Sequence, residues 1–198
     1  ADASPAAGDL LFIQQRLEGQ DLQRLAKGTS SAQKLTLSFW VQSNVTGTYV
    51  AEIYDADNTR QVSASYAISA SGVWEKKTIT FDGDTTGVFD NDNALSGVLG
   101  FWLGAGSNYT SGTLNTGWAS AVSANRAAGQ TNLAAATNNY WQVTGVQLEV
   151  GETATTFEHK KFGQELAECQ RYYEKSYDLD VFPGETNATS GSWSQVGA

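Results

Sequence analysis

Residues 34–42 read KLTLSFWVQ, and their apolar and polar side chains alternate without a break. One face of this segment carries Leu35, Leu37, Phe39 and Val41, and the other carries Thr36, Ser38, Trp40 and Gln42. A period of two is that of an extended chain with one buried face. The segment therefore predicts a β-strand that borders a core.

The same signal recurs further along the chain. Further strands are predicted over residues 48–54, 60–68, 73–81, 97–104 and 140–150. The Asp/Asn-rich turn between the first two of these predicts a hairpin. In the segment 140–150, the alternation of core-facing residues changes phase between Val143 and Val146, which predicts a β-bulge near Gly145.

A helix is predicted near the end of the chain. From residue 163 to 175, Leu166, Cys169 and Tyr173 recur every three to four positions among charged and amide side chains. This spacing is typical of an amphipathic helix. We expect its apolar stripe to pack against the sheets or a second copy, with Cys169 as a buried thiol.

Together these segments predict an all-β fold. About seven strands with turn signals between them, and no βαβ spacing, indicate an antiparallel β-sandwich of the jelly-roll kind followed by a short amphipathic helix. We expect the sandwich to span residues 1–158, a linker and the helix 159–178, and the start of a further C-terminal element 179–198.

Charge and composition exclude some classes of partner. Only 17% of the residues are charged, the net charge is −9, and the twelve basic residues are scattered. Phosphate binding needs clustered Lys and Arg, so we expect no nucleic-acid partner. No apolar run approaches the roughly 20 residues that span a bilayer, so we expect no membrane insertion. One cysteine cannot build an internal disulfide framework.

The residue inventory also argues against catalysis. The single histidine, His159, lies in a charged segment, and one His with one Cys cannot assemble a usual zinc site. Among 21 acidic residues no pair stands out as the two carboxylates of a glycoside hydrolase. We therefore expect no enzyme activity and no catalytic residues.

One loop resembles part of a calcium site. Residues 82–87 read DGDTTG, which matches the first half of a calcium-binding loop, with Asp82 and Asp84 as oxygen ligands. Asn93 stands where a closing Glu is needed, although Asp90 and Asp92 offer further oxygen atoms. The alternative is a plain loop of Asx turns without a cofactor.

Aromatic residues give two candidate sugar-binding positions. Flat rings stack on sugar faces while amide side chains reach the hydroxyl groups. For Trp40 and Trp102 we expect a covering segment, and hence ordinary packing. Tyr109 and Trp118 lie in the long polar stretch 104–139 near Asn108 and Asn115, where glycan binding and packing are equally good interpretations.

One long segment carries a family resemblance. Residues 140–173 read YWQVTGVQLEVGETATTFEHKKFGQELAECQRYY, which resembles a segment of phage and prophage structural proteins. Its markers are TGVQLEVG, then A-T-x-F-E, then a helix ending E-L-x-x-C-Q-R-Y-Y. The upstream stretches AAGDLLFIQQRLEG, LTLSFWVQSNVTGTYV and VWEKKTITFDGDT resemble the same family. The resemblance implies a jelly roll similar to carbohydrate-binding modules, with additional strands before the position of Ala1.

The resemblance also implies a function. It indicates a bacteriophage virion protein, either a tail fibre, head fibre or spike or a capsid decoration subunit, with a glycan-binding or host-adsorption role. The expected partners are further copies in a trimer, other virion proteins and host surface polysaccharide. The expected location is the virion surface, after synthesis in the bacterial cytoplasm without a signal peptide. The alternative is a monomeric carbohydrate-binding module of a secreted bacterial glycoside hydrolase.

Overall fold

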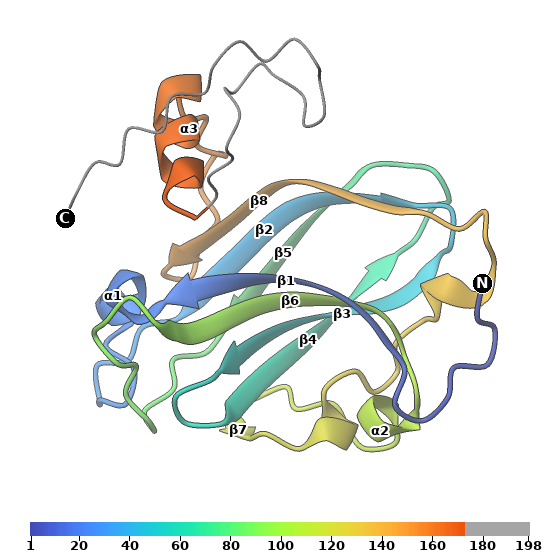
Figure 1. Ribbon diagram of the computed structural model, residues 1–198, viewed down its shortest axis with the longest axis horizontal. Helices are drawn as coiled ribbons and strands as arrows, with labels where there is room; N and C mark the ends of the chain where they lie inside the picture. Colours follow the sequence, from blue (N-terminus) through green and yellow to red (C-terminus); the bar gives the residue numbers. More distant parts are fainter. Residues whose placement is uncertain (173–198) are drawn as a thin grey trace, which may run out of the picture. The chain divides into compact units, whose positions relative to one another are not determined.

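Two antiparallel β-sheets form the body of the protein, as the alternating segments predict. The structure is a computed structural model, and it describes residues 1–172. One sheet has the order β1 (Leu10–Glu18), β6 (Leu95–Ala105), β3 (Gly47–Asp55), β4 (Arg60–Ile68) and β7 (Ala119–Ser120). The other has the order β5 (Glu75–Phe81), β2 (Leu35–Ser43) and β8 (Trp141–Val150). Figure 1 shows both layers.

The remaining elements are short helices. They are α1 (Gly19–Leu22), α2 (Ser107–Thr110), α3 (Phe162–Gln170) and three 3-10 turns at Gln23–Leu25, Ser123–Asn125 and Leu133–Ala135. The chain forms two compact units, Ala1–Phe157 and a second that begins at Glu158. The sandwich therefore lies in the first unit and α3 in the second.

The strand pairs are nested around one hairpin. β3 and β4 form that hairpin, as the turn residues predict. β2 pairs with β5 and β1 pairs with β6, each pair enclosing the previous one in sequence. β8 joins β2 and ends the three-stranded sheet. Each pairing is antiparallel, which confirms the predicted sandwich class.

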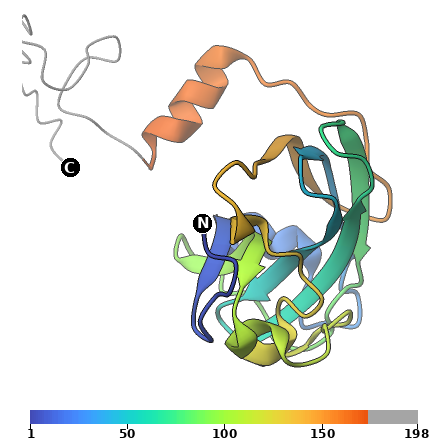
Figure 2. The ribbon, with the colours of Figure 1, turned by 90° about the vertical axis from the view of Figure 1, so that its right-hand side faces the viewer.

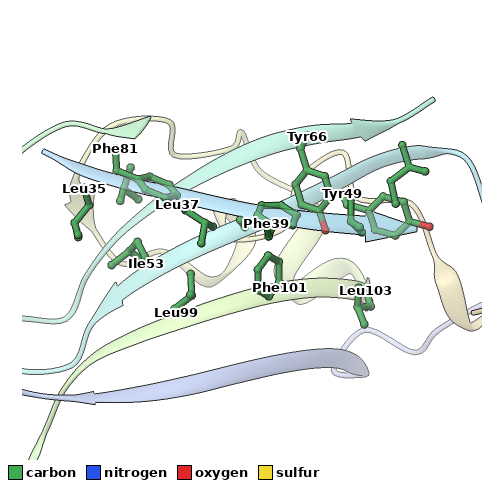
Figure 3. Packing of buried hydrophobic residues seen from close by; sticks show 14 of the residues in the cluster. Leu35, Leu37, Phe39, Tyr49, Ile53, Tyr66, Phe81, Leu99, Phe101 and Leu103 are labelled. Carbon is green, nitrogen blue, oxygen red and sulfur yellow. The ribbon is translucent and has the colours of Figure 1, made fainter. Parts of the chain in front are cut away.

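The core lies between the sheets and is built by the predicted inward residues. Leu37, Phe39 and Val41 of β2 are fully buried. The Phe39 ring meets the rings of Tyr66 and Phe101 edge-on, with centroids 5.1 Å apart in both cases. Figure 3 shows β2 side chains facing those of β6 across this layer. Aromatic contacts of this geometry add to the stabilisation from burial itself.

The predicted bulge in β8 is present. The pairing with β2 shifts register between Ser38 and Trp40, and Gly145 has φ +58°, in the left-handed region that glycine tolerates best. The extra residue lets both Val143 and Val146 point towards the core. The change of phase in the sequence is therefore the signature of this bulge.

Two strands were not predicted from the sequence pattern. β1 lies at an edge of the five-stranded sheet, most of its residues are exposed, and its register slips between Leu11 and Phe12. An edge strand with a slipped register has no clean alternation, so its pattern was not recognised. β7 has only two residues, too few for any periodic signal.

The C-terminal helix is confirmed, and the packing of its apolar stripe against the sheets or a second copy stays a prediction. Leu166 is partly buried, and Cys169 is exposed on α3 rather than enclosed as a buried thiol. The helix carries no buried residue. The spacing of the apolar residues predicted the helix correctly, but amphipathic spacing does not specify what packs against the apolar face. Tyr173 lies outside the described residues.

Two adjacent residues of β2 test the assignment of faces. We expect Phe39→Ala to lower the free energy of unfolding by about 3–5 kcal/mol, because it leaves a cavity between three rings. Trp40→Ala, one position along on the opposite face, is the matched control and should cost less than about 1 kcal/mol. Urea unfolding monitored by circular dichroism measures both. Similar losses in the two variants would contradict the assignment.

Candidate functional site

The four aspartates of the calcium-like loop do not come together. Asp82 is exposed and lies 3.4 Å from the Lys34 ammonium, whereas Asp84 is buried. Asp84 and Asp92 each accept a hydrogen bond from the backbone N–H two residues on. Asp90 is exposed, and its N–H donates to Asp57. Within residues 1–172, no group of three or more His, Cys, Asp or Glu side chains is arranged to hold a metal ion.

The loop instead surrounds the ammonium group of Lys27. Lys27 Nζ donates to Asp55 Oδ2 at 2.5 Å, to the Gly87 carbonyl at 2.8 Å and to the Thr86 carbonyl at 3.0 Å. Asp84 Oδ2 lies 3.1 Å from the same nitrogen. The part of the sequence that resembles a cation site therefore does face a cation, and that cation belongs to the chain.

Arg60 completes a buried ion cluster. Its guanidinium holds Asp84 with two hydrogen bonds, 2.7 Å from Nε and 3.0 Å from the Nη2 nitrogen. Burial alone would raise the pKa of Asp84, but the hydrogen bonds from Arg60 and the adjacent positive charge of Lys27 outweigh it and lower the pKa below the ordinary 3.8. The contribution of Asp84 to this cluster requires that its carboxylate stay ionised.

This cluster predicts a specific acid sensitivity. Because the pKa of folded Asp84 is lowered, its contribution is complete above pH 3.8 and is lost as the pH falls through the lower folded value. We expect Asp84→Asn to cost about 3 kcal/mol or more at neutral pH, because it leaves the buried Lys27 and the partly buried Arg60 underpaired. Its unfolding free energy should then depend less steeply on pH below 3.8 than that of the wild type.

Urea unfolding across this pH range measures both effects. Asp82→Asn, in the same loop but exposed, is the matched control and should unfold like the wild type. Equal pH slopes in Asp84→Asn and the wild type would contradict the lowered pKa.

The long connection between β6 and β8 covers the outer face of the five-stranded sheet. Arg126 holds the fully buried Glu52 with two hydrogen bonds of 2.8 Å, and Trp102 Nε1 donates to Glu52 at 3.1 Å. Burial alone would lower the pKa of Arg126, but its bonds to Glu52 outweigh this and raise it. Figure 2 shows this connection running beside the sheet. Trp102, 1% exposed, is covered as predicted.

The two candidate sugar-binding residues of this connection are used in packing. The Tyr109 ring lies 5.3 Å from that of Trp102. Trp118 lies 5.1 Å from the Lys27 ammonium and donates from Nε1 to the Asp82 carbonyl. Asn115 accepts a hydrogen bond from Asn125, and Asn108 is exposed. Both rings are partly buried and belong to separate apolar clusters, so they do not form one platform.

The outer face of the three-stranded sheet carries the exposed rings. Trp40, on the central strand of this sheet, is 44% exposed. The prediction that another segment covers Trp40 is therefore wrong. Trp74 and Tyr140, which directly precede β5 and β8, are exposed as well. The Gln42 amide donates to the Gly72 carbonyl at 2.8 Å, and the Tyr140 hydroxyl also lies close to Gly72. We call these residues and their polar neighbours the Trp40 face.

Polar side chains surround these rings. Trp40 pairs with Thr144 on one side and with Lys76 on the other, and Gln42 pairs with Gln142. Apart from Gln42, which is partly buried, these polar residues are exposed. An aromatic ring flanked by hydroxyl and amide groups matches the apolar faces and polar edges of a sugar.

The segment after β8 bounds the Trp40 face on one side. The Gly151 carbonyl accepts a hydrogen bond from Thr36, and Thr155 contacts Glu149 through both its N–H and its hydroxyl. Hydrogen bonds from Gln147 and Thr155 lower the pKa of Glu149. Phe157, at the end of this segment, lies near Gly145 of β8: a Cβ on Gly145 would be 3.7 Å from the Trp40 ring and 3.8 Å from the Phe157 ring. Phe157 therefore lies beside Trp40.

The sequence contained a signal for this face. Strict alternation in 34–42 places Trp40 with Thr36, Ser38 and Gln42, on the side away from the core. What could not be read from the pattern was whether another segment covers that side. In the structure the long connection covers the other sheet, because Arg126 is paired with Glu52 there.

Neither a scan against protein-family models nor searches of curated proteins and solved structures found a match for this chain. Within residues 1–172 no helix is long and apolar enough to cross a membrane.

Proposed function

We propose that this protein is a non-catalytic glycan-binding domain and that its binding site is the Trp40 face. The observation that supports this most strongly is the exposed Trp40 ring in the middle of a three-stranded sheet, between Thr144 and Lys76. Trp40 lies beside Phe157, and 44% of its surface is still exposed to solvent at the centre of the sheet. A sugar ring stacked on it would remove apolar surface from water and keep its hydroxyl groups within reach of the amides.

The arrangement favours the Trp40 face over Tyr109 and Trp118 in the long connection between β6 and β8. Tyr109 and Trp118 each have one side occupied by the protein's own groups, Trp102 in the first case and Lys27 in the second. A ligand stacking there would have to displace these contacts. Trp40, Trp74 and Tyr140 are each more than one third exposed; Trp40 lies in β2, and the other two directly precede β5 and β8.

We further propose that the domain belongs to a bacteriophage virion fibre, spike or decoration protein that adsorbs to host surface polysaccharide. The support is the resemblance of residues 140–173 to phage structural proteins, together with a sandwich followed by a separate helical unit. The second candidate is a carbohydrate-binding module of a secreted glycoside hydrolase, which the same exposed rings also favour.

Substitution at Trp40 tests the site. We expect Trp40→Ala to weaken retention on a bacterial surface polysaccharide by about 10-fold or more, because it removes the central stacking ring. Asn108→Ala, in the long connection between β6 and β8, is the matched control and should bind like the wild type. Affinity electrophoresis against a panel of bacterial polysaccharides measures both. Retention lost in Asn108→Ala and kept in Trp40→Ala would place binding in the loop.

The assembly state separates the two candidate proteins. We expect the purified chain to scatter light as a trimer, because strand edges such as that of β1 are exposed in one chain and neighbouring copies would cover them. Multi-angle light scattering gives the mass directly. A monomer at all concentrations that still binds glycan would favour the binding module of a hydrolase.

A further inference from the structure

The environment of Lys27 has the composition of a cation site. Four oxygen atoms surround Nζ within 3.1 Å, two from the carboxylates of Asp55 and Asp84 and two from the carbonyls of Thr86 and Gly87. An ammonium group has three protons to donate. The fourth oxygen, from Asp84, is therefore held by charge rather than by a hydrogen bond of its own. We call these four atoms the oxygen cage.

The oxygen cage is closed to solvent. The side chains of Lys27 and Asp84 are each 4% exposed, and that of Asp55 is fully buried. The rings of Phe89 and Trp118 lie 5.0 and 5.1 Å from Nζ, within the range of cation–π attraction. Aromatic faces and oxygen atoms thus present negative potential to the same point.

The loop is held in shape independently of Lys27. The Asn58 amide donates to both oxygens of Asp55 and to the Val88 carbonyl. Gly87 has φ +76°, and a Cβ there would lie 2.6 Å from Asn58, so only glycine turns the chain at this point. The two carbonyls are therefore directed at the cage by backbone geometry that loss of the lysine would not remove.

Charge balance selects the kind of ion that fits. The carboxylates of Asp55 and Asp84 are matched by Lys27 and Arg60, so the buried cluster is neutral. Removing the ammonium leaves one negative charge, which a monovalent cation restores. A divalent cation would leave an excess positive charge beside Arg60, which is unfavourable in a buried site.

We propose that the oxygen cage is a cation site in which the Lys27 ammonium takes the place of a metal ion, and that it binds K⁺ once that ammonium is removed. K⁺ has the charge of an ammonium group and nearly its size. The proposal explains why residues 82–87 read like half of a cation loop although their carboxylates are paired with side-chain cations. It does not depend on glycan binding.

Lys27→Ala tests the proposal by ionic rescue. We expect this variant to melt at least about 4 °C higher in ~200 mM KCl than in the same concentration of choline chloride, whose cation is too large for the cage. The wild type should melt at the same temperature in both salts. Lys27→Met is the matched control, because it fills the space without charge, and it should gain nothing from K⁺.

A second variant and a structural measurement complete the test. Lys27→Ser adds a hydroxyl oxygen to the cage and should show the same gain from KCl. Crystals of the rescued variant grown with Rb⁺ should show anomalous density between Asp55 and Gly87. Equal melting in both salts for Lys27→Ala and Lys27→Ser, or failure of both to fold in either salt, would overturn the proposal. A larger gain from Ca²⁺ than from K⁺ at equal ionic strength would overturn the assigned charge balance.

Discussion

The structure depends on β2 having two different faces and two hydrogen-bonded neighbours. It is the central strand of its sheet, between β5 and β8. Its inward side chains, which include Phe39, form the middle of the core, and its outward side chains include Trp40. Because successive residues of a strand point to opposite faces, one segment supplies both the packing of the domain and its candidate binding surface. A slip of one residue in its pairing would exchange the two roles.

The two sheets treat their outer faces differently, and electrostatics explains the contrast. On the five-stranded sheet, the buried carboxylate of Glu52 needs a partner, and Arg126 in the long connection supplies it. That pairing brings the connection down over Trp102 and Tyr109. On the outer face of the three-stranded sheet, Thr36 and Ser38 are buried, whereas Thr144, Gln142 and Lys76 around Trp40 are exposed and can hydrogen-bond to water.

The edges of the sheets are also treated differently. On β5, Glu75 and Lys77 form an ion pair of 2.6 Å and are only partly exposed. Charged residues of this kind protect an edge strand from pairing with other chains. On β1, by contrast, Leu10 and Ile13 are about half exposed. The β1 edge therefore differs from the β5 edge in chemistry as well as in position.

The sequence by itself determined the elements whose signal is local. Alternation in 34–42, the Asp/Asn turn of the β3–β4 hairpin and the phase change around Gly145 each depend on neighbouring residues alone, and each was predicted correctly. The partners that meet across the fold were decided only by the tertiary structure. The sequence pattern around Asp84 predicts a calcium ligand, whereas folding places Lys27, 57 positions earlier in the chain, beside it. The pattern does not show that Trp40 stays exposed, because Arg126 holds the long connection over the other sheet. Periodicity reports which way a side chain points, whereas burial and charge pairing depend on residues that only folding brings together.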